Sequence, residues 1–375
     1  MENTRPTAMV VDMKAFEENV SEIKKYVGDK ITLIPIIKAN GYGTFINTKV
    51  DILDRFDIVA VALVDEAVTL RKLGYSKEIL VINQPYIDEL SKIKKYNITI
   101  GLSSKEFLDE LLNNSKSCNN CNNNESKQEK VKVHLELETG MGRTGISDLD
   151  LEEYIRNVKK CNIIEVEGIY SHMSSADSDE IYTQNQINKF DEGVGMIKKY
   201  FNNIKYIHIS ASNGILNFPN SYYNAVRPGI ILYGYEPFDG ASFKMRLKPV
   251  CKLKSKITFL KNVPENTSIG YSRKFITSRP SKIATIPIGY ADGLRRSYSK
   301  DGYVVINGKQ AKIIGNICMD SFMADVTDFK DINVGDDVYI WDNDLIKLEE
   351  VAEKCGTINY EIMSTISDRV PRVFE

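Results

Sequence analysis

The chain has 375 residues, enough for two domains or one large barrel. Its 49 Lys and Arg residues balance 51 Asp and Glu residues, and a formal net charge of −2 speaks against a nucleic-acid or membrane-surface binder. The longest apolar run is too short to cross a bilayer, and we expect no secretory signal at the start of the chain. Six cysteines do not make a disulfide framework, so we expect a cytoplasmic protein with reduced thiols.

The candidate metal ligands are few. The chain has three histidines, and none of them form a His-x-x-x-His pair. Cys118 and Cys121 have the spacing of metal ligands, but they lie in residues 113–124, where seven of twelve residues are Asn. We therefore predict a mobile loop in this segment, inserted ahead of the fifth strand, and no metal site.

The first part of the chain alternates short β-branched runs with helical patterns. A first helix is predicted over residues 14–26, followed by further helices over 64–73, 151–159 and 185–200. Eight strands are predicted at residues 33–37, 58–62, 79–82, 98–101, 131–137, 164–170, 206–210 and 224–226. Repeated strand–helix units argue for a parallel sheet, here a (β/α)₈ TIM-like barrel, with a doubly wound open sheet as the alternative.

Beyond residue 236 the pattern changes. Short β-rich runs occupy residues 250–260, 282–288, 302–306, 310–314, 321–326 and 337–341, separated by Gly, Asn, Asp and Pro. A helical period returns only at 348–354. We predict a barrel domain over residues 1–235 and a C-terminal all-β domain over residues 236–375, with the first ten or so residues expected to pack with the β domain.

Lys38 ends the apolar stretch 33–37 and is followed by Ala-Asn-Gly-Tyr-Gly. In a parallel barrel the carboxyl ends of the strands form the active face, so the Lys38 amine is expected at its mouth. A partly desolvated lysine has a lowered pKa and can form a Schiff base. The alternative is a lysine that caps a strand and extends to solvent.

Motifs along the whole chain resemble those of the alanine racemase family. They are KANGYG at 38–43, ETGMGRTG at 138–145, GIYSH at 168–172, HISAS at 208–212, VRPGIILYG at 226–234, GYSR at 270–273, PIGYADG at 287–293, ICMD at 317–320, YE at 360–361 and SDRVPR at 367–372. Each motif is weak alone, but together they are specific. The resemblance implies a barrel and a β domain in a head-to-tail homodimer with shared active sites.

The resemblance also implies a cofactor, pyridoxal 5'-phosphate, which delocalises the carbanion formed when the Cα proton of an amino acid leaves. Racemisation needs a base on each face of the substrate. By the resemblance, Lys38 binds the cofactor and is the first base, and Tyr271 is the second base, contributed by the β domain of the partner subunit. Without the family motif, Tyr271 would be one of 20 tyrosines and a core residue.

Further cofactor contacts follow from the resemblance. Arg227 matches the arginine that faces the pyridine nitrogen, and His172 is expected on the same face, hydrogen-bonded towards Arg227. The phosphate is expected to contact Ser212, Tyr42 and Tyr360 through their hydroxyls. It is also expected to contact Gly229 and Ile230 through their backbone amides. Taken alone, each of these would be an ordinary core, strand-end or surface residue.

For the substrate carboxylate, the resemblance implies Arg143 and the backbone N–H of Met319 from the partner subunit. Glu136 stands where many family members have a carbamylated lysine, and we expect it to hold Arg143 directly. Other departures lie at Thr44-Phe45, at Ser272 and at Asn316, where many relatives have an arginine at the substrate entrance. These differences affect the expected substrate range and not the proton chemistry.

We therefore predict an isomerase that interconverts L-alanine and D-alanine by a two-base mechanism, supplying D-alanine for peptidoglycan. Its only predicted partners are a small amino-acid substrate and a second copy of the chain, with no nucleic acid and no membrane. The alternatives are a racemase of serine or another amino acid, a fold-related decarboxylase of a diamino acid, and a cofactor-binding protein without catalysis. The triple-glycine phosphate motif expected for the decarboxylase is absent from the sequence.

Overall fold

Eight short parallel strands surround a barrel core in the first part of the chain. The computed structural model describes residues 4–119, 130–237 and 245–375. The barrel strands are β2 (Thr32–Leu33), β3 (Ile58–Val61), β4 (Glu78–Val81), β5 (Thr99–Leu102), β6 (Val131–Glu136), β7 (Ile164–Tyr170), β8 (Tyr206–His208) and β9 (Ala225–Val226). Strands β3 to β8 pair in sequence order, and β2 pairs with β9.

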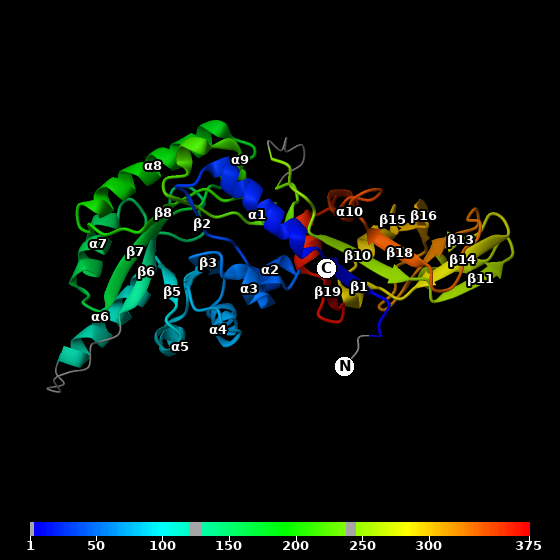
Figure 1. Ribbon diagram of the computed structural model, residues 1–375, viewed down its shortest axis with the longest axis horizontal. Coiled ribbons are helices and arrows are strands. Elements are labelled where there is room, and N and C mark those ends of the chain that lie inside the picture. The colour runs from blue at the N-terminus through cyan, green and yellow to red at the C-terminus, as the bar shows by residue number, and fades with distance from the viewer. Residues whose placement is uncertain (1–3, 120–129, 238–244) are drawn as a thin grey trace.

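Two contacts close the barrel between the sheet β3–β8 and the strand pair β2–β9. Ile36 forms a parallel bridge with Ala60, which joins the β2 segment to β3. On the other side, the Arg227 amide donates to the Ser210 carbonyl at 2.9 Å, which joins the segments after β9 and β8. The predicted (β/α)₈ barrel is therefore confirmed, and the open-sheet alternative is wrong (Figure 1).

Helices lie outside the barrel strands. They are α1 (Met13–Val27), α3 (Val50–Leu53), α4 (Val64–Lys72), α5 (Leu90–Lys95), α6 (Lys105–Asn119), α7 (Leu151–Lys160), α8 (Glu180–Lys198) and α9 (Ser212–Asn217). α1, α4 and α7 begin and end within one residue of prediction. α8 begins five residues earlier than predicted, because the Asp179 side chain caps it by accepting from the Tyr182 amide at 2.8 Å. None of the described helices has the length and hydrophobicity needed to span a bilayer.

The prediction of a loop over residues 113–124 was wrong in its first half. α6 continues to Asn119, so residues 113–119 are helical despite their Asn content. The apolar face of this helix, with Phe107, Leu108 and Leu111 buried, stabilises it beyond the preference of Asn for loops. Residues 120–124, Cys121 among them, lie outside the described residues.

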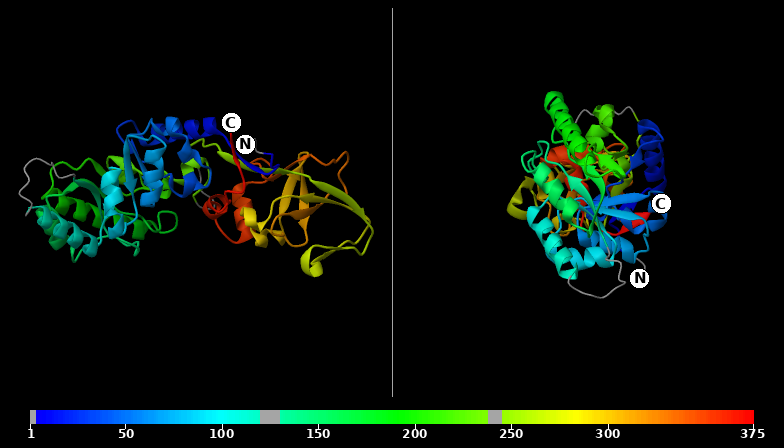
Figure 2. Two further views of the ribbon diagram at one scale, coloured as in Figure 1. Left: turned by 90° about the horizontal axis from the view of Figure 1, so that it is seen from below. Right: turned by 90° about the vertical axis from the view of Figure 1, so that its left-hand side faces the viewer.

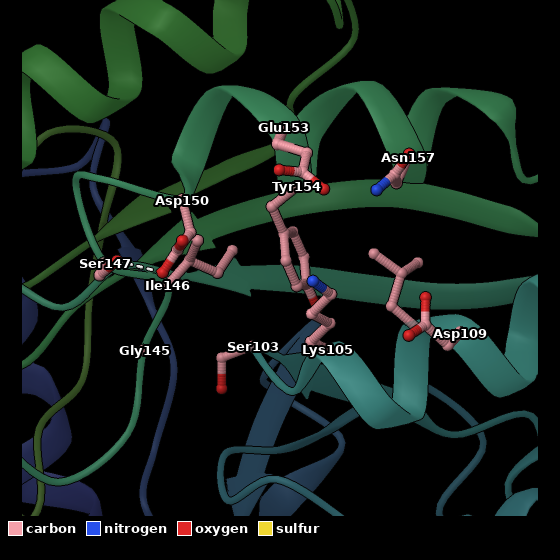
Figure 3. Close-up of a pocket in the computed structure, with 11 residues that line it drawn as sticks. Ser103, Lys105, Asp109, Gly145, Ile146, Ser147, Asp150, Glu153, Tyr154 and Asn157 are labelled. Atoms are coloured by element: carbon pink, nitrogen blue, oxygen red, sulfur yellow. Dashed lines mark hydrogen bonds between the residues drawn. The ribbon is translucent and has the colours of Figure 1, made fainter.

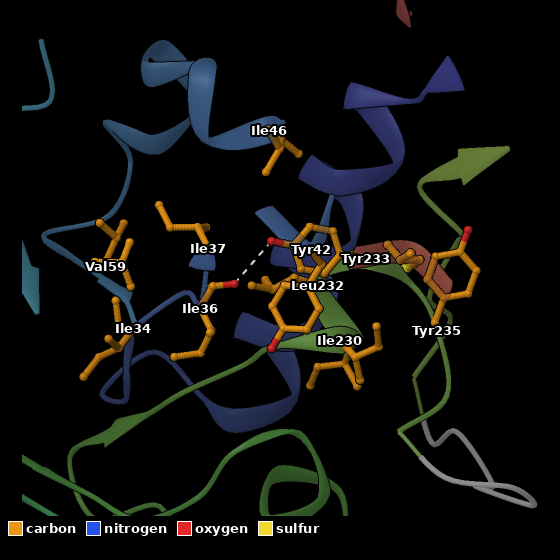
Figure 4. Close-up of a cluster of buried hydrophobic side chains, with 14 of the residues drawn as sticks. Ile34, Ile36, Ile37, Tyr42, Ile46, Val59, Ile230, Leu232, Tyr233 and Tyr235 are labelled. Atoms are coloured by element: carbon orange, nitrogen blue, oxygen red, sulfur yellow. Dashed lines mark hydrogen bonds between the residues drawn. The ribbon is translucent and has the colours of Figure 1, made fainter. Parts of the chain in front are cut away.

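A buried apolar cluster fixes the barrel end near residues 34–46. Ile34, Ile36 and Ile37 pack there with Tyr42 and Tyr233 (Figure 4). The Tyr42 and Tyr233 rings lie 4.8 Å apart, and the Tyr233 hydroxyl donates to the Ile36 carbonyl at 3.2 Å. The backbone that follows β2 is thus held from inside the core.

The C-terminal region is built on a nine-stranded sheet with the order β11-β14-β17-β16-β15-β18-β10-β1-β19. Its strands are β1 (Ala8–Val11), β10 (Cys251–Lys256), β11 (Phe259–Val263), β14 (Ser281–Ile286), β15 (Tyr303–Ile306), β16 (Lys309–Ile314), β17 (Phe322–Asp325), β18 (Asp337–Trp341) and β19 (Arg372–Phe374). A separate hairpin joins β12 (Ser268–Ile269) to β13 (Phe275–Ile276). The predicted strand at 250–260 is two strands, broken between β10 and β11. The predicted β-rich C-terminal part is confirmed.

The two ends of the chain meet in this sheet. β1 pairs with β10 on one side and, in parallel, with β19 on the other. Figures 1 and 2 show the barrel and the sheet side by side along the long axis of the molecule, with β1 and β19 near the junction. Two helices, α10 (Leu348–Cys355) and α11 (Asn359–Ser364), also lie there, and α11 contacts the barrel segment that carries Lys38.

Candidate active site

A cavity of about 480 Å³ opens at the carboxyl ends of the barrel strands. This is the face on which parallel barrels carry their functional residues, and the volume is typical of a small-molecule site. α11 of the C-terminal region contributes Tyr360 and Ser364 to the same wall. The sequence-predicted residues that line the cavity are Lys38, Tyr42, Arg143, His172, Ser212, Arg227, Gly229 and Tyr360.

Lys38 does not lie at the end of a regular strand, as the sequence had suggested. β2 stops at Leu33: the Ile34 and Ile36 amides still donate to the Val226 and Pro228 carbonyls, but Pro35 and Pro228 have no N–H to donate in turn. Lys38 instead begins α2 (Lys38–Tyr42), a turn in which Ala39, Asn40 and Gly41 have φ of 52°, 54° and 61°. Left-handed backbone is costly for residues with a Cβ and persists only where the surroundings enforce it.

Neighbouring groups hold this left-handed turn. Glu66, at the start of α4, accepts the Ala39 amide at 2.6 Å and the Ala62 amide at 2.8 Å, so one carboxylate ties the turn to the end of β3. The Gly43 carbonyl accepts from Arg372 Nε at 2.8 Å. A Cβ on Gly43 would lie 2.2 Å from the Met363 carbonyl oxygen, so only glycine fits against α11. The lysine turn is therefore fixed from both halves of the chain.

The Lys38 ammonium group lies in a cationic part of the cavity. Burial lowers the pKa of Lys38, and the positive charges of Arg143 and Arg227 lower it further, while Glu66 opposes them. A lowered pKa increases the fraction of the free amine, which is the form that acts as nucleophile and base. This environment agrees with the expectation for a reactive lysine and disagrees with a lysine that merely extends to solvent.

Arg227, directly after β9, is buried with all its Nη donors engaged. Nη1 donates to His208 Nδ1 at 2.6 Å and to the His208 carbonyl at 3.0 Å. Nη2 donates to the carbonyls of Ser171 at 2.7 Å and Ile209 at 3.0 Å, and contacts His172 Nδ1 at 3.2 Å. The expected contact between Arg227 and His172 is therefore present. Burial lowers the Arg227 pKa to about 10, so the guanidinium stays charged at neutral pH.

The histidines behind Arg227 have assignable tautomers, because a guanidinium only donates hydrogen bonds. His208 Nδ1 must accept from Arg227, so His208 Nε2 carries the proton that faces His134 Nδ1 at 3.0 Å. Burial and the charge of Arg227 lower the pKa of His172 to about 3, and burial lowers that of His134 to about 3. The pKa of His208 is also well below its usual range, for the same two reasons. All three rings are neutral at physiological pH.

A second part of the cavity carries neutral donors. The Ser212 side chain accepts from the Gly229 amide at 3.1 Å, which places both beside the start of α9. Tyr42 is buried, with its ring 6.0 Å from that of Tyr360. Ile230, predicted as a further backbone contact, is fully buried and is not among the residues that line the cavity.

Arg143 is exposed and makes no hydrogen bond or ion pair with any residue that the structure describes, although it lines the cavity. The expectation that Glu136 holds it directly was wrong. Glu136 is buried and accepts from Thr144 Oγ1 at 2.8 Å, next along the chain from Arg143. Burial raises the Glu136 pKa, and the Thr144 hydrogen bond opposes this. Glu136 therefore fixes the backbone beside Arg143, not the guanidinium itself.

Tyr271 and Met319 lie outside the cavity of their own chain. Both are on the surface of the β domain, where Tyr271 is 69% and Met319 is 52% exposed. Tyr271 follows the β12 strand, and Met319 lies on the loop between β16 and β17. One chain therefore brings together Lys38 and the other predicted residues that line its cavity, but it does not bring Tyr271 or Met319 to that cavity.

The residues of the cavity fit pyridoxal phosphate. Hydroxyls of Ser212, Tyr42 and Tyr360 and the first amides of α9 provide donors for a phosphate. A Cβ on Gly229 would lie 2.7 Å from the Tyr42 hydroxyl oxygen, so glycine leaves the space between these donors open. Arg227 Nε is the one guanidinium nitrogen that donates to no described residue, and Arg227 borders the cavity. An amine, a cation and a cluster of neutral donors in one pocket match an anionic aldehyde with a ring nitrogen.

Sequence reasoning missed Tyr170 and His208 as parts of this site. Tyr170 lines the cavity, stacks on the His208 ring at 5.4 Å and donates to the Ile82 carbonyl at 2.7 Å. The signal was available, because Tyr170 precedes His172 by two residues and successive alternate residues share one face of a strand. His208 was within a recognised motif but had no expected role.

A smaller cavity of about 210 Å³ lies outside the barrel, between α6 and α7 (Figure 3). Lys105 and Asp109 from α6 face Tyr154 and Glu153 from α7 there. None of the sequence-predicted site residues borders it. Within the described part of the chain, no group of three or more His, Cys, Asp or Glu side chains could hold a metal ion.

Known proteins support the same assignment. The family described as "Alanine racemase, N-terminal domain" matches residues 11–237, and "Alanine racemase, C-terminal domain" matches residues 250–374. The chain is 37% identical over 377 residues to "Alanine racemase 2" of Caldanaerobacter subterraneus subsp. tengcongensis, covering 99% of this chain and 95% of the relative. It is 36% identical to the alanine racemase of Methanococcus maripaludis, covering 99% of both.

Solved structures agree with the sequence relatives. The alanine racemase of Clostridium difficile 630 superposes with a TM-score of 0.91 at 33% identity, covering 100% of this chain and 97% of that one. The alanine racemase of Bacillus anthracis with bound L-Ala-P has a TM-score of 0.90 at 31% identity, covering 100% and 96%. The fold, the cavity and these likenesses lead to one conclusion: the chain belongs to the alanine racemase family of isomerases.

Proposed function

We propose that the protein interconverts L-alanine and D-alanine with pyridoxal 5'-phosphate bound in the barrel cavity. The observation that carries the proposal is the convergence of Lys38, Arg227 and Ser212 on one cavity with the chemistry each role requires. The full-length similarity to alanine racemases supports the choice of substrate.

In this proposal, Lys38 binds the cofactor covalently, and Ser212, Tyr42, Tyr360 and the Gly229 amide hold the phosphate. Ile230 retains its proposed role through its backbone amide at the start of the following turn. His172 and His208 keep Arg227 in place. When bound, the cofactor acts as an electron sink that makes the Cα proton of an attached amino acid removable. Because Arg227 keeps its own proton, it would not protonate the ring nitrogen of the bound cofactor and would so limit how strongly the ring withdraws electrons.

Lys38 moves the proton on one face of the substrate. Its lowered pKa means that a larger share of the amine is free to accept a proton at neutral pH. The second face needs a second base, and we assign it to Tyr271. Since Tyr271 lies on the exposed surface of its own β domain, the partner subunit's copy would complete the site in a head-to-tail homodimer.

The substrate carboxylate needs a cation and a backbone donor. Arg143 lines the cavity and uses no described protein acceptor, so its guanidinium is available. Met319 would supply the backbone N–H from the partner. We further propose that the enzyme works in the cytoplasm and supplies D-alanine for peptidoglycan. The free thiols of Cys161, Cys251, Cys318 and Cys355 are compatible with a reducing compartment.

The test is racemisation by the purified, cofactor-loaded protein on a panel of L-amino acids, with each D-product measured. We expect D-alanine to form fastest, and equal or faster turnover of serine would overturn the assignment of alanine. Borohydride reduction followed by peptide mapping should label Lys38. Lys38→Ala should bind no label and lose turnover, and a label on another lysine would refute the attachment site.

A further inference from the structure

The turn that carries Tyr271 rests on a neighbouring loop, residues 315–321, between β16 and β17. The side-chain amide of Asn316 donates from Nδ2 to the Tyr271 carbonyl at 3.0 Å. Tyr271 itself is mostly exposed, so its own side chain has little packing to fix its position. Within one chain, this hydrogen bond ties the backbone of the Tyr271 turn to the neighbouring loop.

The backbone around Tyr271 needs such a restraint because it is strained. Ser272 and Arg273 both have positive φ, at 60° and 50°, although neither is glycine. Conformations of this kind are costly for residues with a Cβ and persist only where the surroundings enforce them. The Asn316 hydrogen bond to the Tyr271 carbonyl is one such restraint.

Two glycines allow Asn316 to reach the turn. A Cβ on Gly315 would lie 2.8 Å from the Ile269 carbonyl oxygen, and Gly315 has a φ of 70°. A Cβ on Gly270 would lie 3.0 Å from Met323 Cε and 3.5 Å from the backbone nitrogen of Asn316. At Gly315 the two segments therefore approach more closely than a side chain would permit, and at Gly270 the positive φ of 72° favours glycine.

A small buried apolar cluster also holds the Asn316 loop against the Tyr271 turn. Ile269 from β12, Ile283 from β14 and Ile314 from β16 are buried together, which places the Asn316 loop against the β12 end. The loop then continues to Cys318, whose Sγ contacts the Asn316 carbonyl at 3.6 Å, and on to the exposed Met319. Asn316 thus links Tyr271 and Met319, the two exposed residues that each subunit of the proposed dimer would contribute to the active site of the other.

We propose that Asn316 is a positioning residue for the second base, acting through the Tyr271 carbonyl. This proposal rests on the proposed function, in which Tyr271 moves the proton on one face of the substrate. Asn316 holds the turn in one backbone conformation and so keeps the Tyr271 phenol in one position relative to the loop. It touches no reacting atom itself.

The experiment uses the cofactor-loaded full-length enzyme and the variant Asn316→Asp, which keeps the side-chain shape but replaces the donor by a carboxylate. Asn316→Ala removes the group altogether. Asn343→Asp is the matched control, because Asn343 Nδ2 also donates to a backbone carbonyl of the β domain, that of Cys251, at 2.8 Å. Racemisation is followed in both directions with α-protiated and α-deuterated alanine.

We expect both Asn316 variants to lower kcat about tenfold or more, with a smaller change in KM, because misplacing a base acts on the transition state. The substrate deuterium isotope effect should rise only in the direction in which Tyr271 removes the proton. A loss of general stability would not produce such an asymmetry. Amide hydrogen exchange over residues 268–276 should become faster in both Asn316 variants and stay unchanged in Asn343→Asp.

Two outcomes would overturn the inference. Asn316 variants with the wild-type kcat and equal isotope effects in both directions would do so, as would asymmetry that Asn343→Asp reproduces. Tyr271→Phe separates this failure from that of the proposed function. If Tyr271→Phe loses turnover while the Asn316 variants do not, only the positioning role is wrong. If Tyr271→Phe keeps full turnover, the assignment of the second base fails as well.

Discussion

Three neutral histidines stand around one buried arginine, and their neutrality has a measurable cost in acid. In the folded protein the pKa of His134 and of His172 is about 3, against about 6.5 in an unfolded chain. Between these values the unfolded chain binds protons that the folded chain does not, so the free energy of unfolding must fall as pH falls. His208 adds to the same trend.

We therefore predict a steep loss of stability below pH 6.5. Each such histidine should remove about 1.4 kcal/mol of unfolding free energy per pH unit once its unfolded form is fully protonated. Urea unfolding at pH 7.5, 6.0 and 5.0 measures the slope. His172→Gln has one fewer of these groups and should show a shallower slope, and a stability that stays constant to pH 5 would contradict the prediction.

At the same scale, Gly229 keeps the proposed phosphate region of the cavity open. The added Cβ of Gly229→Ala would lie 2.7 Å from the Tyr42 hydroxyl oxygen, closer than carbon and oxygen atoms pack, so we expect weaker cofactor binding. Titration of the cofactor-free protein with pyridoxal phosphate, followed by absorbance, measures the effect. Gly195→Ala is the control, because no atom lies within 4 Å of its added Cβ on α8. Equal affinity in both variants would refute the role of Gly229.

Among the elements, α2 shows most clearly what the sequence could and could not predict. The KANGYG motif identified Lys38, and the periodicity of α1, α4 and α7 predicted those helices. The left-handed turn could not be read from local residues, since Ala39 and Asn40 adopt it only because Glu66 and the α11 segment hold them. β1 was not predicted as a strand, because its partners β10 and β19 lie far away in the sequence.

The contact of α2 with α11 gives an element-scale prediction. Gly43→Ala should destabilise the protein more than Gly74→Ala, although both glycines have positive φ, at 80° and 101°. At Gly74 the cost is only the strained backbone, about 1–2 kcal/mol, because no atom lies within 4 Å of the new Cβ. At Gly43 the Cβ also meets the Met363 carbonyl at 2.2 Å. Urea unfolding compares the two, and equal losses would show that α11 does not constrain the turn.

For the whole molecule, the separation of Lys38 from Tyr271 predicts complementation between inactive variants. Lys38→Ala and Tyr271→Phe homodimers should each lack activity. A heterodimer with one chain of each kind has one site with both changes and one site with neither, so it should regain about half of the wild-type turnover. The two chains are co-expressed with different tags and purified in tandem.

A heterodimer without activity would mean that each site takes both bases from one chain. The wild-type protein should sediment as a dimer at assay concentrations, which serves as the control for assembly. Tyr271 and Met319, both exposed on the β domain, are the residues that each subunit would contribute to its partner in the proposed arrangement.

The place of β1 in the sheet has a consequence for synthesis on the ribosome. This strand is made first, yet its neighbour β10 follows about 240 residues later, and β19 is among the last residues translated. The sheet at the junction therefore cannot form until translation is nearly finished. Because α11 also contacts the lysine turn, a nascent chain stalled before residue 359 lacks that contact, and of the groups that hold the turn only Glu66 is then in place.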